Sequence, residues 1–381
     1  MRRPDARVWL VVAALAVFVA GVVLRTRVLE GRRQSLLGRR SDLPRILAHA
    51  ADYTAARAAG ERPRFIPGER TIALTDLPTR VAALSLGGLR GFLAIYLWVE
   101  AESAKNQRSH EDLLDRYYRI ANLQSDYTSV WEFHSWNLAW NVSVQWASVE
   151  RRYEWVRYGI EFLAEGIRRN PRSVNLLEAM GRIYYQRIAQ NTRTEDREHF
   201  TAKVQQDDGA HPLRIAYKWY VLARQMQDET GESHATYSKK ILHQQSCYAA
   251  HELAKELTYR ALTVLADAAR LQTDGQSDEA ARRLAEGRDG LLVARTWWVR
   301  TVEEWGRQRA QYPDDFNAGL FGRGAWQAGR EVETLLAHLT PAQLRSDPHS
   351  FAVRVNSAKG HRLLVAQNRY EEERPEEYHG P

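Results

Sequence analysis

The arrangement of large, small and aromatic residues around Pro171 restricts the fold more than any other feature of this chain. Leu177 follows the proline by six residues, and Gly181 and Tyr184 follow Leu177 at intervals of four and three. Residues three or four apart lie on the same face of an α-helix. Because a proline does not continue a helix, the pattern predicts that one helix ends before Pro171 and that another begins after it.

The same kind of position recurs upstream. Leu97 and Trp131 are 34 residues apart, and Trp131 and Leu177 are 46 residues apart. Gly159 and Gly166 fall in the expected second helix of the longer unit, where small residues let two helices approach closely. The spacing therefore predicts an all-α fold built from stacked antiparallel helix pairs.

These positions resemble the tetratricopeptide repeat, in which a large residue, a leucine, a glycine or alanine and a tyrosine mark the first helix and a proline closes the second. The likeness is best over residues 90–190. It implies a TPR-like α-solenoid whose surface holds other proteins. The block at residues 129–141 is also similar to membrane-anchored helical-repeat proteins of bacterial envelopes, which implies a location and an architecture rather than a reaction.

The periodic apolar residues and the breaks between them divide the chain into six parts. These are a basic tail at 1–7, a transmembrane anchor at 8–24, a basic juxtamembrane segment with a short helix and a linker at 25–76, TPR-like repeats at 77–230, a C-terminal helical region at 231–369, and a disordered acidic tail at 370–381.

Individual helices can also be placed. Apolar periodicity predicts helices at 213–226, 244–271, 277–311 (as one helix or two), 318–339 and 350–366. The polar stretch at 190–212 is interpreted as an insertion that displaces the second helix of the third unit. Ser109 and Ser129, each with an acid three residues later, have the capping-box pattern that predicts a helix start.

Residues 8–24 are continuously apolar or small and contain no charge. A bilayer-spanning helix needs roughly 20 such residues, with about 17 as the lower limit. A cleaved signal peptide is the alternative, but arginines follow at once and no clean cleavage site precedes them, so we expect a single-pass anchor in an inner (cytoplasmic) membrane. The short basic tail favours an extracytoplasmic (periplasmic) domain, whereas the arginines that follow the span favour the opposite orientation.

The net charge of +7 comes from the anchor region. Residues 1–40 contain nine arginines and two acids, so the remaining chain is balanced. A nucleic-acid-binding domain concentrates basic residues on the folded part, and we therefore expect no nucleic-acid partner. Cys247 is the only cysteine, which excludes an intramolecular disulfide and does not distinguish cytosol from periplasm.

Four residues are the candidate partner-binding site: Trp136, Asn137, Trp140 and Asn141. The tryptophans share one helix face and the asparagines form a neighbouring stripe. Indole rings could grip side chains of an extended peptide while the amides bond its backbone. The alternative is that these tryptophans fill the space between helices, since tryptophan is usually mostly buried.

His243, Cys247 and His251 follow one another at intervals of four on an expected helix. The outer two are about 12 Å apart along the axis, because each residue rises about 1.5 Å. They cannot all reach one ion at bond lengths of about 2 Å. We therefore predict no metal site and no cofactor, while leaving open whether His243 and Cys247 bind an ion with help from another helix.

The combined features favour a non-catalytic, membrane-tethered scaffold or adaptor that binds protein partners within an envelope complex, with no small-molecule substrate. Two alternatives stay open. An all-α carbohydrate-active enzyme would need two carboxylates facing an aromatic-lined cleft. A structural subunit of a larger membrane machine would show broad apolar patches on its outer helices.

Overall fold

The computed structural model describes residues 89–107 and 109–364, all within one compact unit of the chain. These residues form helices and contain no strand, which confirms the all-α prediction. In chain order the elements of this part are α4 (Leu89–Asn106), α5 (His110–Leu123), α6 (Thr128–Trp136), the π-helix η1 (Asn137–Val142), the 3-10 turn η2 (Ser143–Gln145), α7 (Val149–Arg169), α8 (Val174–Arg182), the π-helix η3 (Ile183–Ala189), α9 (Thr194–Asp208), α10 (Pro212–Thr230), α11 (Lys239–Thr273), α12 (Ser277–Gln311), α13 (Phe316–His338), α14 (Pro341–Ser346) and α15 (Pro348–Lys359).

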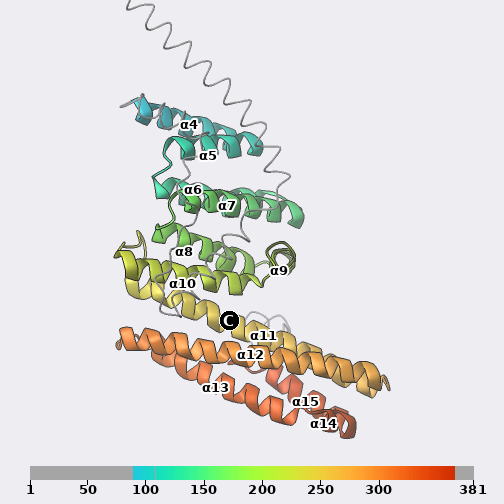
Figure 1. Ribbon diagram of the computed structural model, residues 1–381. Coiled ribbons are helices and arrows are strands. Elements are labelled where there is room, and N and C mark those ends of the chain that lie inside the picture. The colour runs from blue at the N-terminus through green and yellow to red at the C-terminus, as the bar shows by residue number, and fades with distance from the viewer. Residues whose placement is uncertain (1–88, 108, 365–381) are drawn as a thin grey trace, which may run out of the picture. The chain divides into compact units, whose positions relative to one another are not determined.

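Helices that are neighbours in the chain pack against each other (Figure 1). The pairs are α4 with α5, α6 with α7, and α8 with α10; α11 packs against both α10 and α12. Contacts of α5 with α6 and of α7 with α8 join successive pairs. Further along, α13 lies against α12, and α15 returns to α11. The small side chains and core residues described below account for this close packing.

Glycines stand where two helices of a pair approach most closely. A Cβ atom added at Gly166 in α7 would lie 2.7 Å from Cγ of Trp131 in α6. One added at Gly181 in α8 would lie 2.7 Å from Cδ1 of Tyr220 in α10. Both tolerated distances are far below van der Waals contact, so the absence of a side chain sets the helix separation. The close approach expected at Gly166 is present.

The predicted helix ends agree with the structure at some places and differ at others. α7 ends at Arg169, immediately before Asn170-Pro171. Ser109 is the N-cap of α5, with its hydroxyl bonded to Asp112 rather than to a backbone amide. The start predicted at Ser129 is wrong by one turn position, because α6 begins at Thr128 with Tyr127 as its N-cap. Residues 277–311 form one continuous helix.

The polar stretch at 190–212 contains a helix that the apolar pattern did not reveal. α9 buries Phe200 and Val204 against the stack. Its first turn supplies Asp196, which accepts a 2.7 Å hydrogen bond from Arg152 of α7. Side chains that are polar in sequence therefore hold α9 in place through a buried ion pair, and this segment is more than an unstructured insertion.

A buried ionic network connects α10, α11 and α12. Glu304 of α12 is 1% exposed and accepts hydrogen bonds from Arg224 at 2.6 Å, Tyr217 at 2.8 Å and Ser246 at 3.4 Å. Burial would raise the pKa of Glu304, but the Arg224 guanidinium outweighs it, followed by Arg307, and the pKa falls to about 2. The carboxylate is thus ionised and joins three helices.

The C-terminal helices share a large apolar core. It is centred on buried residues from α11, α12, α13 and α15, among them Leu262, Leu265, Trp298, Val332 and Phe351. The predicted anchor at 8–24, the juxtamembrane segment and the tail at 370–381 lie outside the described residues. Within 89–107 and 109–364, none of the helices has both the length and the apolar character that a bilayer crossing requires.

Candidate functional site

The two predicted tryptophans lie next to each other at the junction of α6 and η1. Trp136 is the last residue of α6 and is 37% exposed, and Trp140 lies within η1 and is half-buried. Their ring centroids are 6.4 Å apart with planes 22° from parallel. The shared face expected from their spacing is therefore present, and part of it is open to solvent.

The predicted asparagines have different environments. Asn137 is 3% exposed; its amide donates to the hydroxyl of Tyr117 in α5 and accepts a 2.7 Å bond from Asn141. The Asn137 amide is therefore committed to bonds inside the protein, which differs from the predicted role of bonding a partner backbone. Asn141 is half-buried and lies nearer the surface.

The tryptophans belong to a longer line of rings, which we call the aromatic row: Trp98, Phe133, Trp136 and Trp140. Trp98 of α4 lies 5.3 Å from Phe133 of α6, and Phe133 lies 6.4 Å from Trp136, measured between centroids. Phe133 is 45% exposed. The row crosses the first helices of two successive pairs, so a partner lying on it would contact both.

Sequence reasoning missed two members of this row. Phe133 precedes Trp136 by three residues and Trp140 by seven, so its helical spacing was a usable signal. Trp98 is 35 residues before Phe133 and comes beside it only through packing of α4 on α6. No local pattern in the sequence reveals that second contact.

His134 forms the floor beneath the aromatic row. Its ring stacks on Tyr117 at 3.8 Å and lies 4.6 Å from Trp98. The side chain is fully buried, and neither ring nitrogen has a hydrogen-bond partner in the structure. Burial lowers the pKa of His134 to about 3. The imidazole is consequently neutral and acts as one more aromatic ring in the packing.

An ion pair borders the row on the side of α8. Glu132 of α6 and Arg182 of α8 are 2.7 Å apart, and both side chains are about a quarter exposed. Arg182 also lies 3.3 Å from the buried Glu178. His234, in the segment after α10, places its Nε2 3.5 Å from Glu178. The rings are thus flanked by paired charges, a common arrangement around an apolar binding patch.

Two π-helices hold the surface from behind. Nε of Arg187 in η3 donates to the carbonyl of Ala139 in η1 at 2.7 Å, and its guanidinium donates to the hydroxyl of Ser143 at 3.0 Å. Asp196 lies 3.6 Å from the same guanidinium. The side chain of Arg187 thereby bonds a carbonyl of the widened turn and fixes η1 against η3. Single π turns inside α-helices are frequent at functional sites.

The three residues considered for an ion are buried in α11. His243 bonds Gln311 at 3.1 Å through Nδ1, while His251 packs against Trp298 and Phe321. Burial raises the pKa of Cys247 to about 12, so the thiol is protonated at neutral pH. Within the part of the chain that the structure describes, no three His, Cys, Asp or Glu side chains are grouped so as to hold a metal ion.

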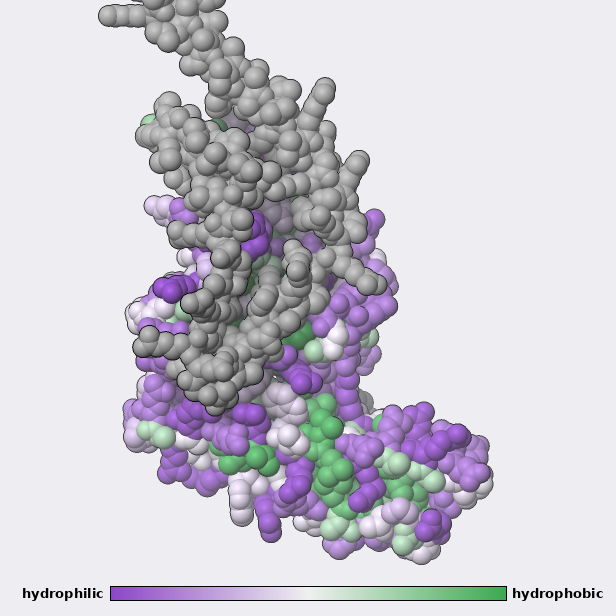
Figure 2. Space-filling model, in the orientation of Figure 1, coloured by the Kyte–Doolittle hydropathy of each residue, from purple (hydrophilic) through white to green (hydrophobic). Residues whose placement is uncertain are grey.

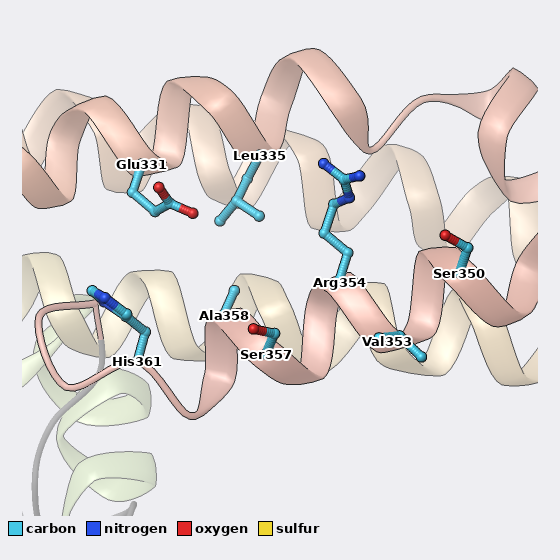
Figure 3. Close-up of a pocket in the computed structure, with 8 residues that line it drawn as sticks. All are labelled: Glu331, Leu335, Ser350, Val353, Arg354, Ser357, Ala358 and His361. Carbon is cyan, nitrogen blue, oxygen red and sulfur yellow. The ribbon is translucent and has the colours of Figure 1, made fainter.

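A shallow groove of about 340 Å³ runs between α13 and α15 (Figure 3). Glu331 and Leu335 line it from α13, and Arg354 and Ser357 line it from α15. His361 stands at the Glu331 end (Figure 3). Its lining contains one carboxylate and no phenyl or indole ring. The groove therefore lacks the carboxylate pair and aromatic walls that the carbohydrate-enzyme hypothesis requires.

Comparisons with protein-family models, with curated proteins and with solved structures find no match for this chain. The fold and the surface define its class as an all-α protein of helices that pack in chain order. Within that class, the distinguishing feature is the half-exposed aromatic row on α4, α6 and η1.

Proposed function

We propose that this protein is a membrane-tethered scaffold whose TPR-like α-solenoid binds protein partners of a bacterial envelope complex through the aromatic row. The observation that carries the proposal is the continuous line of partly exposed rings from Trp98 to Trp140. Large aromatic side chains supply most of the binding energy at many protein interfaces. A row of them on packed helices is already in place before a partner arrives.

Rigid support strengthens this interpretation. The row rests on buried His134 and on η1, which is bonded to η3 through Arg187. Because the backbone beneath the rings is fixed, little conformational entropy opposes association. The flanking pair of Glu132 and Arg182 could orient a polar neighbour without requiring a charged partner.

The tether and the location are part of the same proposal. Residues 8–24 would anchor the chain in an inner membrane, and the helical part would lie outside the cytoplasm. Attachment to the bilayer raises the effective concentration of partners on the same membrane. A reporter that is active only outside the cytoplasm, fused after Pro381, tests the location; activity of a cytoplasm-specific reporter at the same position contradicts it.

The binding surface is tested by co-purification from membranes in mild detergent. A double variant, Phe133→Ala with Trp136→Ala, removes two exposed rings, and we expect it to lose a partner that the unmodified chain retains. Losses of at least about 2 kcal/mol, or roughly thirtyfold in affinity, are typical for such residues. Trp326→Ala is the matched control, because Trp326 is 59% exposed on α13, away from the row.

Equal recovery of the partner with the double variant and with the control would count against the aromatic row. A chain that co-purifies with nothing at any concentration would count against the scaffold function as a whole. Circular dichroism of both variants checks that the helices are intact.

A further inference from the structure

α4 has a second apolar face that no described helix covers. Phe92, Ile95, Tyr96 and Val99 are 73%, 63%, 58% and 64% exposed. Their spacing places them on one side of the helix. The opposite side packs through residues such as Ala94 and Ala101, which are buried. A helix that is apolar all round is normally buried all round.

Exposed apolar surface is also present over the C-terminal helices (Figure 2). Leu292 and Val299 of α12 and Trp326 of α13 are about half exposed. Nothing about these residues identifies what covers them. The α4 face differs, because the residues that directly precede it in the chain have a matching pattern.

Helix pairs in this protein follow a simple register. Glu100 lies six residues before the end of α4, and its ion-pair partner Arg116 lies six residues after the start of α5. Trp305 lies six residues before the end of α12, and Gly322, which faces it, lies six residues after the start of α13. Facing residues are thus equally far from the connection between the helices.

The residues before α4 satisfy the same register. α4 begins at Leu89, directly after Gly87-Gly88, and a connection of two to five residues is usual between antiparallel helices. Counting outwards from this connection, each apolar residue on one side has an apolar counterpart on α4. The three pairs are Leu84 with Phe92, Val81 with Ile95, and Leu77 with Val99.

We propose that residues 77–86 form a helix that packs antiparallel on the exposed face of α4 and closes this end of the stack. The inference does not depend on the proposed function. A second copy of the chain is the less favourable occupant, because one helix face is small compared with the roughly 1,200 Å² that stable interfaces bury. A segment two residues away has a far higher effective concentration.

The proposal has a consequence for binding. If residues 77–86 cover α4, this face is unavailable to partners, and the aromatic row is left as the exposed apolar surface of the N-terminal helix pairs. The linker between the predicted anchor and the helical part then ends near residue 76 rather than at Leu89.

Cysteine cross-linking in the full-length chain tests the register. Val81→Cys with Ile95→Cys places thiols on an expected facing pair, and a short bismaleimide reagent joins them. Val81→Cys with Gln107→Cys is the matched control, because Gln107 is exposed near the end of α4 and out of register. The native Cys247 is fully buried and does not compete. We expect the facing pair to cross-link at least roughly tenfold faster than the control.

Three outcomes overturn the proposal: equal rates for the two pairs, no cross-link in either, or covalent dimers formed by Ile95→Cys alone, which would identify a second copy. A labelling experiment guards against misfolding of the double variants. The single variant Ile95→Cys should react with a maleimide roughly tenfold faster once Leu77, Val81 and Leu84 are changed to serine. An unchanged rate also overturns the proposal.

Discussion

At the scale of single residues, His134 has a cost that depends on pH. It is fully buried without a hydrogen-bond partner, and burial lowers its pKa to about 3. In the unfolded chain the imidazole titrates near its usual value of about 6.5. Below pH 6.5 the unfolded state therefore binds a proton that the folded state does not bind, so stability is complete above this pH and is lost as the pH falls towards 3.

The substitution His134→Phe should flatten this dependence. Each proton bound only on unfolding changes the unfolding free energy by about 1.4 kcal/mol per pH unit. Between pH 6 and pH 4 the variant should thus lose less stability than the unmodified chain, by about that slope. Urea unfolding at a series of pH values measures the difference. Phenylalanine keeps a ring between Tyr117 and Trp98, so the packing is largely retained.

The control is His349→Gln, at an exposed position of α15. This variant should keep the slope of the unmodified chain. His251 is a second buried histidine whose pKa burial lowers to about 3, so part of the slope should persist in the His134 variant. If His134→Phe and His349→Gln have the same slope, the imidazole of His134 is not neutral in the folded state.

At the scale of elements, two helical glycines should respond in opposite directions to alanine. Gly166→Ala adds a Cβ atom that would meet Trp131 at 2.7 Å, and overpacking of this kind typically costs about 1–3 kcal/mol. Gly306, within α12, has nothing within 4 Å of an added Cβ. There alanine should stabilise the protein by about 0.5–1 kcal/mol through helix propensity. Thermal unfolding measured for both variants would contradict the account if their effects had the same sign.

Much of this level could be predicted from the sequence. Pro171 marks the end of α7, and Gly166 marks a close approach, because each reflects local chemistry of the backbone or the absence of a side chain. α9 escaped prediction because Asp196 and Arg152, polar in sequence, form a buried ion pair 44 residues apart. The two π-helices also left no recognisable pattern.

The candidate site was predictable in part for the same reason. Trp136 and Trp140 share a face through helical spacing, which is local information. The bond from Asn137 to Tyr117 spans 20 residues, and the contact of Trp98 with Phe133 depends on how α4 packs on α6. Spacing within one helix indicates neither, so the internal role of Asn137 and the extent of the aromatic row required the structure.

At the scale of the described molecule, the network around Glu304 joins the N-terminal helix pairs to the C-terminal helices. Arg224 of α10 is 8% exposed and lies 2.6 Å from Glu304 of α12. Removing one partner of a buried ion pair leaves an uncompensated charge and typically costs about 3–5 kcal/mol. An exposed ion pair contributes about 0–1 kcal/mol.

Two neighbouring glutamates separate these cases within one helix. Glu304→Gln should lower the free energy of unfolding by about 3–5 kcal/mol, because Arg224 loses its counter-charge in a buried position. Glu303→Gln changes a side chain that is 53% exposed and paired only with Arg300, so we expect less than about 1 kcal/mol. Urea unfolding at pH 7 compares the two variants. Equal losses would show that the Glu304 carboxylate is not an ionised link between α10 and α12, and the coupling of the two halves would then have to come from apolar packing alone.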